Sequence, residues 1–186
     1  EVAMMVVNWA KLAQKVRFFV AALNALDRNI WAIPGDGPDL VHEVTETLLR
    51  KLPIDSSRIY LFGQSSGAVF ALRLGLLESQ YFAAVAIHAG SFQRGSADFA
   101  TVRLARRKLP VLIISGDRDP IFPPASVKST VAAMQAAGIP AESFIMNGHD
   151  HRYYALVADS INARAWEFLK KQSLKGTPRY EAYALP

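Results

Sequence analysis

The sequence predicts an α/β fold in which a mostly parallel sheet of about five strands is flanked by helices. Two features of the chain lead to this prediction. Short apolar runs with the length of buried strands recur along the sequence, and amphipathic helical stretches separate them. With 186 residues, of which 51% are hydrophobic, the chain can also bury a sizeable core, so residues 1–186 are expected to form a single domain.

The first third of the chain contains two predicted helices and one predicted strand. A helix over residues 1–15 is followed by a strand over residues 16–23, whose aromatic and branched residues suit a sheet that is buried on both faces. Turn-forming residues between Pro34 and Pro38 predict a loop over residues 24–39. The next helix is expected to bury one apolar stripe, which consists of Leu40, Val44, Leu48 and Leu52.

Strands and helices alternate through the rest of the chain. Strands are predicted over residues 59–62, 81–88, 111–115 and 142–146. Helices are predicted directly after the first of these strands, over residues 123–137 and over residues 160–171. This alternation implies strand–helix–strand crossovers and therefore a parallel sheet. Residues 175–186 show no periodicity, and we expect them to form a tail across the surface.

One stretch carries a chemical motif, residues 63–67 (Gly-Gln-Ser-Ser-Gly), between a predicted strand and a predicted helix. A serine on such a sharp turn has a strained backbone that pushes its hydroxyl out of the sheet. Glycines two residues to either side remove β-carbons that would collide where strand and helix fold back on each other. The sequence therefore predicts Ser65 as a nucleophile. The amide of Ser66 lies at the helix N-terminus, where an oxyanion would be stabilised.

A serine needs a base and an orienting acid before it can attack an ester. Asp117 and Asp119 directly follow one predicted strand, and His149 and His151 follow the next strand along the chain. Open α/β sheets place their functional sites at the carboxyl ends of their strands. The residues alone thus leave two candidates for the acid and two for the base.

Three segments together resemble the α/β-hydrolase superfamily. They are residues 63–67, residues 116–120 (Gly-Asp-Arg-Asp-Pro) and residues 148–154 (Gly-His-Asp-His-Arg-Tyr-Tyr). The most similar branch is that of the polyhydroxybutyrate-depolymerase-like and feruloyl-esterase-like carboxylesterases. The Asp-His-x-Tyr-Tyr pattern also resembles the S-formylglutathione hydrolases. The likeness extends from about Trp9 to Leu169. The nucleophile motif is shared across the superfamily, so it indicates the fold more sharply than the substrate.

The resemblance implies an α/β-hydrolase fold and a serine esterase with a Ser-His-Asp triad. It selects Asp119 as the acid, and Asp117 would then be a turn residue that bonds its own backbone. It selects His151 as the base, with His149 lining the site or bracing its loop.

Further side chains are candidates for contact with a substrate: Gln64, His149, Tyr153 and Trp31. For the aromatic ones, packing in the core or at its rim is an equally good explanation. A metal site built from residues 149–151 is an alternative for the histidines. Adjacent ligands on one loop rarely converge on a single ion, so we expect neither a metal nor a cofactor.

The resemblance also implies strands that this sequence lacks. Superfamily members have additional N-terminal strands, and the loop after one of them gives a second oxyanion amide from a His-Gly or Gly-Gly element. The first glycine of this chain is Gly35, so no such loop precedes it. We expect either that the chain is N-terminally incomplete or that its oxyanion hole is built differently. Because one oxyanion donor is worth about a hundredfold or more in turnover, the chain alone is expected to hydrolyse small activated esters weakly.

Composition restricts the partners that the chain could have. The sequence has no cysteine, so it contains neither a disulfide nor a thiolate metal site. The net charge of +5 is scattered, and the one basic cluster, within residues 103–108, is interpreted as the solvated face of a short helix rather than a nucleic-acid patch. No apolar run approaches the roughly 20 residues of a membrane span. The expected partner is a small-molecule or polymer ester; compartment and oligomeric state are left open.

Two other functions are alternatives to the esterase. One is a non-catalytic or weakly active hydrolase-like domain, which keeps the motif residues but lacks the second oxyanion donor. The other is a serine peptidase of the prolyl-oligopeptidase type. Such peptidases usually carry a further domain that gates the site, for which 186 residues leave no room. The esterase is therefore the preferred interpretation.

Overall fold

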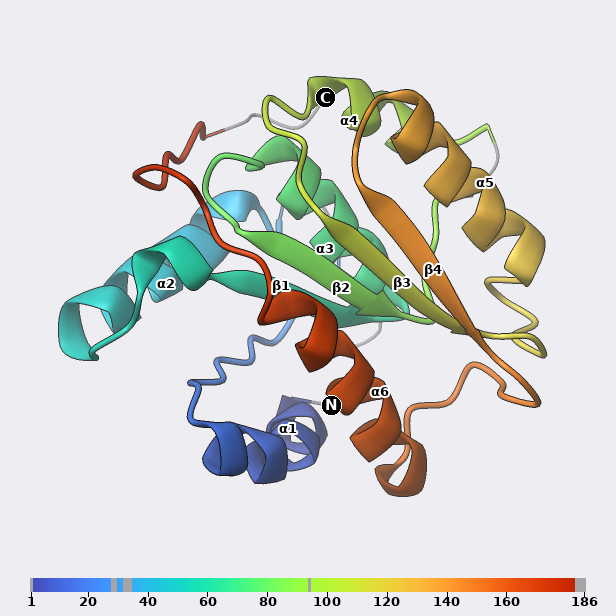
Figure 1. Cartoon of the computed structure of the whole chain (residues 1–186), viewed down its shortest axis with the longest axis horizontal. Coiled ribbons are helices and arrows are strands. Elements are labelled where there is room, and N and C mark those ends of the chain that lie inside the picture. The colour runs from blue at the N-terminus through green and yellow to red at the C-terminus, as the bar shows by residue number, and fades with distance from the viewer. Residues whose placement is uncertain (1, 28–29, 32–34, 94, 183–186) are drawn as a thin grey trace.

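Four strands form one parallel sheet in the computed structural model, in the order in which they occur along the chain (Figure 1). They are β1 (Tyr60–Gln64), β2 (Ala84–His88), β3 (Val111–Gly116) and β4 (Ala141–Met146). The structure describes residues 2–27, 30–31, 35–93 and 95–182. Gln64 is in register with His88, and Gly116 with Met146. The carboxyl ends of the four strands therefore lie along one edge of the sheet.

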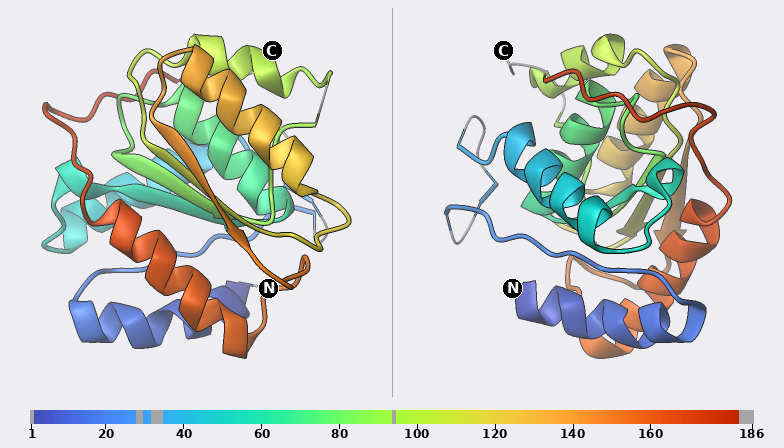
Figure 2. Two further views of the ribbon diagram at one scale, coloured as in Figure 1. Left: turned by 45° about the vertical axis from the view of Figure 1, so that its right-hand side comes forward. Right: turned by 90° about the vertical axis from the view of Figure 1, so that its left-hand side faces the viewer.

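Helices cover both faces of this sheet. Figure 2 shows α1 and α6 on one face and α3, α4 and α5 on the other. Their bounds are α1 (Val2–Val16), α3 (Ser66–Leu77), α4 (Asp98–Leu104), α5 (Pro124–Ala136) and α6 (Ala155–Leu169). α2 (Pro38–Lys51) lies beyond β1 and contributes Val41 to a cluster with Phe70 and Leu74 of α3. One short 3₁₀ turn, Ser56–Arg58, leads into β1.

The two central strands are apolar on both faces because each face meets a layer of helices. In β2, Val85 and Ile87 pack on the α3–α5 side, whereas Ala84 and Ala86 pack on the α1–α6 side. β3 alternates in the same way, and all of its residues are buried. The uninterrupted apolar runs that predicted these strands are thus explained by burial on two sides.

The strand predicted over residues 16–23 is wrong, because the structure forms four strands among the described residues and none lies there. Instead α1 continues through Val16, and Arg17 ends it with a φ of 60°. The residues that follow pack Phe18 and Val20 against the α1–α6 side of the core. Strand structure requires a neighbour that supplies ladder hydrogen bonds. This segment has none in the described part of the chain, so its β-prone composition does not produce a strand.

Some predicted boundaries and faces also differ from the structure. α6 starts at Ala155 rather than near residue 160, because the carbonyl of Tyr154 accepts hydrogen bonds from Val157 and Ala158 and so begins the helix earlier. In α2 the predicted stripe is not the most buried one: Leu40 is exposed, Val44, Leu48 and Leu52 are half-buried, and the buried residues are Pro38 and Val41.

The basic cluster at residues 103–108 is not a solvated helical face, which corrects the prediction. α4 ends at Leu104, so only Arg103 lies on it. Arg107 instead donates hydrogen bonds to the carbonyls of Ser79, Phe82 and Ala83, at 2.7 to 2.9 Å. These carbonyls follow α3, so the guanidinium stabilises the turn between α3 and β2.

The described part of the C-terminal tail crosses to the α2 side of the molecule (Figure 2). Tyr180 stacks on His42 of α2, with ring centroids 3.8 Å apart, and donates a hydrogen bond to Asp39. Residues 183–186 of the predicted tail lie outside the described residues. Within the described residues, the structure contains no helix with the length and apolar character needed to cross a bilayer.

Candidate active site

Ser65 occupies a strained turn between β1 and α3. Its φ of 55° and ψ of −122° lie in a region that L-residues rarely adopt. Its amide donates a hydrogen bond to the carbonyl of His88 at 3.2 Å, which ties the turn to the end of β2. A Cβ added at Gly63 would lie 2.1 Å from the carbonyl oxygen of Gly67, so the strand and helix approach each other too closely for any side chain there. The predicted need for glycine before the serine is thus met at Gly63.

His151 and Asp119 form a continuous hydrogen-bonded chain with this serine. His151 Nε2 lies 2.9 Å from Ser65 Oγ, and His151 Nδ1 lies 3.0 Å from Asp119 Oδ2. The Asp119 side chain is fully buried, and its other oxygen accepts the amides of Ile121 and Phe122, each at 2.9 Å. Both carboxylate oxygens are therefore occupied, and the carboxylate is fixed against rotation. The three residues come from the ends of β1, β3 and β4.

Asp117 has a different place from Asp119. Its side chain is exposed, and Oδ1 accepts the amide of Gly148 at 2.7 Å. The prediction that it bonds the backbone of its own turn misses this contact, because the partner is a neighbour in space and not in sequence. A Cβ at Gly116 would lie 2.0 Å from the carbonyl oxygen of His149, so these two loops are in close contact.

His149 pairs with a histidine of β2, whereas His151 contacts Ser65. His149 Nε2 lies 3.0 Å from Nε2 of His88, and both rings are buried. Burial, together with the neighbouring His149 and His151, lowers the pKa of His88 to about 3, so His88 is neutral at ordinary pH. Sequence analysis does not identify this pairing; the available signal was that His88 ends a buried strand beside the nucleophile strand.

The other candidate residues fall into two groups. Gln64 and Trp31 lie beside the nucleophile turn: Gln64 donates from Nε2 to the carbonyl of His151 at 3.3 Å, and Trp31 stacks on Phe70 with its Nε1 3.4 Å from a Cβ position at Gly67. Tyr153 lies in the core under α6, where its hydroxyl donates to Asn162 at 2.5 Å and burial raises its pKa. The structure does not bring Tyr153 to the surface around Ser65.

Residues 149–151 do not converge on a common point, as a metal site would require. His149 faces His88, His151 faces Ser65, and Asp150 accepts hydrogen bonds from the amide and guanidinium of Arg152. These hydrogen bonds lower the pKa of Asp150. Within the described residues no group of three or more potential ligands is placed to hold a metal ion.

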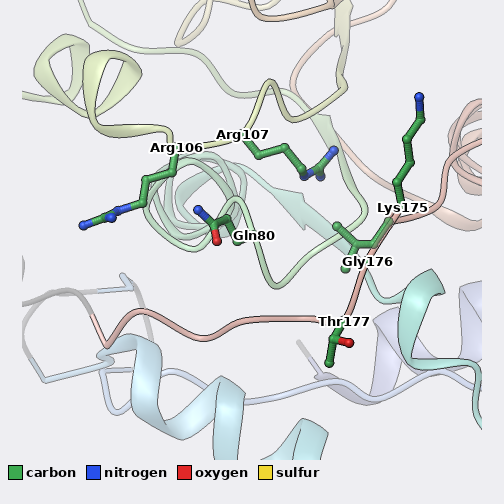
Figure 3. A pocket seen from close by; sticks show the side chains of 7 residues that line it. Gln80, Arg106, Arg107, Lys175, Gly176 and Thr177 are labelled. Carbon is green, nitrogen blue, oxygen red and sulfur yellow. The ribbon is translucent and has the colours of Figure 1, made fainter.

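A large groove and a smaller cavity lie on the described surface. The groove, of about 1210 Å³, runs along the unpaired side of β1 and reaches Gln64, Ser66 and Gly67, so it begins beside the nucleophile turn. The smaller cavity, of about 350 Å³, lies near the amino-terminal ends of β2 and β3 and is lined by Arg106, Arg107 and Lys175 among others (Figure 3). In Figure 3 the side chains of Arg106 and Lys175 point away from each other, so the charges do not converge on a ligand.

Known proteins share this sequence pattern and this fold. Residues 38–164 match the model of the phospholipase/carboxylesterase family. NocK of Nocardia uniformis subsp. tsuyamanensis, which is named as an esterase, is 30% identical over 105 residues, which are 56% of this chain and 29% of NocK. This chain thus spans less than a third of that relative.

Two solved structures show the same fold at low identity. Esterase PE8 is 21% identical with a TM-score of 0.64, and the match covers 90% of this chain and 87% of PE8. The structure of a protein described as a dipeptidyl aminopeptidase IV, from Bacteroides ovatus, is 19% identical with a TM-score of 0.61, and the match covers 74% of this chain and 22% of that one. The depolymerase-like branch is not singled out by these matches and stays a prediction. On the family match over more than half of its length, the chain belongs to the phospholipase/carboxylesterase family of α/β-hydrolases.

Proposed function

We propose that this protein hydrolyses carboxylic esters through an acyl-enzyme on Ser65, with His151 as the base and Asp119 as the orienting acid. The observation that carries the proposal is the unbroken chain Ser65 Oγ–His151 Nε2, 2.9 Å, and His151 Nδ1–Asp119 Oδ2, 3.0 Å. These are the distances at which a base can take a proton from a nucleophile. Membership of the family and the naming of NocK as an esterase support the same reaction.

Acylation begins when Ser65 Oγ attacks the carbonyl carbon of the ester. The new C–O bond forms as the hydroxyl proton moves to His151 Nε2, and the carbonyl oxygen becomes an oxyanion. Asp119 accepts Nδ1–H, which holds the imidazole in the tautomer that leaves Nε2 free, and stabilises the imidazolium. The bond to the alcohol then breaks, and the leaving oxygen takes the proton from His151.

Deacylation repeats these steps with water. His151 removes a proton from water as its oxygen attacks the acyl carbon, and the bond to Ser65 Oγ breaks with return of the proton to the serine. Ser66 is the first residue of α3, so its N–H has no partner within the helix and is a donor for the oxyanion. The reaction as proposed needs neither a metal nor a cofactor.

The test of this function compares an ester with an amide of the same acyl group. We expect the protein to turn over p-nitrophenyl acetate and to leave p-nitroacetanilide and prolyl p-nitroanilide peptides intact over the same period. Release of p-nitrophenol and of p-nitroaniline is followed by absorbance. Preferential cleavage of the anilides would favour a peptidase instead, and absence of both activities in the folded protein would favour the non-catalytic alternative.

A further inference from the structure

Two buried histidines lie next to the proposed triad without belonging to it. His88 is 0% exposed at the carboxyl end of β2, and His149 is 7% exposed on the loop between β4 and α6. Their Nε2 atoms are 3.0 Å apart, which is hydrogen-bonding distance. One of the two nitrogens must carry a proton and the other must accept it.

The surroundings of His88 decide which ring donates. Its Nδ1 is buried and has no hydrogen-bond partner among the described residues. A buried N–H without an acceptor is rarer and more costly than a buried lone pair without a donor. His88 therefore carries its proton on Nε2 and donates it to Nε2 of His149. His149, whose Nε2 accepts, then carries its own proton on Nδ1.

His88 contacts both halves of the proposed catalytic machinery. Its carbonyl accepts the amide of Ser65 at 3.2 Å, and its side chain holds His149, two residues before His151. The loop that carries His151 has further anchors: the amide of Arg118 donates to the carbonyl of His149 at 2.9 Å, and Gln64 donates to the carbonyl of His151. Gln64 and His88 both join the nucleophile turn to the loop of the base, and His88 does so through a fully buried side chain.

We propose that His88 is a positioning residue. Its Nε2–H, donated to His149, fixes the position of the loop that carries His151 and therefore the distance between His151 Nε2 and Ser65 Oγ. The proposal rests on the proposed function. Proton transfer requires heavy atoms within about 3.2 Å, and a displacement of about 1 Å can cost a hundredfold in rate. A ring that fixes the distance between base and nucleophile therefore acts on turnover without touching the substrate.

The first experiment reads the hydrogen bond directly and does not depend on activity. In the ¹⁵N-labelled protein we expect His88 to be protonated on Nε2 and His149 on Nδ1, with a scalar coupling across the hydrogen bond between the two Nε2 atoms. Protonation of His88 on Nδ1, or no coupling between the two rings, would overturn the proposal. Because ester turnover plays no part in this readout, failure of the proposed function and failure of the pairing are distinguishable.

The second experiment measures kcat and KM for p-nitrophenyl acetate in four variants. His88→Leu and His149→Leu remove the pairing and are each expected to lower kcat about tenfold to a hundredfold, with little change in KM. His88→Gln is expected to recover most of the loss, since its amide Nε2 can donate to the same acceptor. The double variant, His88→Leu with His149→Leu, should be no slower than the worse single one, because both remove one interaction.

His42→Leu is the matched control, because His42 is a partly buried histidine of α2 that contacts Tyr180 and lies outside the proposed machinery. It is expected to keep the kcat of the unchanged protein. A folded His88→Leu variant with unchanged kcat would overturn the proposal, and so would a folded His88→Gln variant as slow as His88→Leu. If His88→Leu does not fold, the kcat of His149→Leu and the ¹⁵N measurement on the unchanged protein decide.

Discussion

Replacement of His151 by alanine is expected to lower kcat for p-nitrophenyl acetate by about 10⁴-fold or more. The imidazole contacts both Ser65 Oγ and Asp119 Oδ2, so its removal takes the base from the nucleophile and leaves the carboxylate with nothing to orient. KM is expected to change much less than kcat, because the side chain takes part in proton transfer and does not bind the ester.

His149→Ala is the comparison for this prediction, because His149 and His151 lie on the same loop but contact different side chains: His149 contacts His88, and His151 contacts Ser65. The loss from His149→Ala should be partial, about tenfold to a hundredfold, because it removes a support of the base and not the base. The two variants are compared by steady-state kinetics, after circular dichroism has shown that each is folded. A dead His149→Ala enzyme beside an active His151→Ala enzyme would show that the two roles are assigned the wrong way round.

Replacement of Asp119 by asparagine is expected to lower kcat by about 10⁴-fold. An amide of the same shape can keep the contacts to the amides of Ile121 and Phe122 through its oxygen, but it then turns an NH₂ group toward His151 Nδ1. The imidazole responds by taking the tautomer with its proton on Nε2, which cannot accept the proton of Ser65. The carboxylate also no longer stabilises the imidazolium.

Asp117→Asn is the matched control for the acid. The new amide oxygen can still accept the hydrogen bond from the amide of Gly148, so the loop keeps its support and kcat should stay close to that of the unchanged protein. Equal losses from Asp119→Asn and Asp117→Asn would contradict the assignment of Asp119 as the orienting acid.

The features that sequence predicted are those that neighbouring residues determine. The turn at Ser65 depends on a glycine two residues before it and on the strand and helix that flank it, and all of these are local. The segments that form β2 and β3 are apolar almost throughout, which is the pattern expected of strands that are buried on two faces. The proposed base and acid could be placed near the serine because all three follow strands of one parallel sheet.

The features that sequence missed depend on partners far along the chain. Residues 16–23 have the composition of a strand, but the described residues offer them no strand to pair with. Arg107 looked like a solvated base, yet it bonds carbonyls more than twenty residues away. His88 and His149 are 61 residues apart in sequence, and no local motif at either position predicts their contact. Such contacts follow from the arrangement of the strands and not from local pattern.

Labelling of the protein with a fluorophosphonate probe tests the central claim, that Ser65 is an activated nucleophile, most directly. The probe forms a covalent bond to a serine only where a base removes the hydroxyl proton and donors stabilise the resulting oxyanion. Peptide mapping is expected to find the adduct on Ser65, with no labelling in Ser65→Ala and normal labelling in Ser66→Ala, which keeps its backbone N–H. Labelling that is undiminished in folded Ser65→Ala would contradict the account.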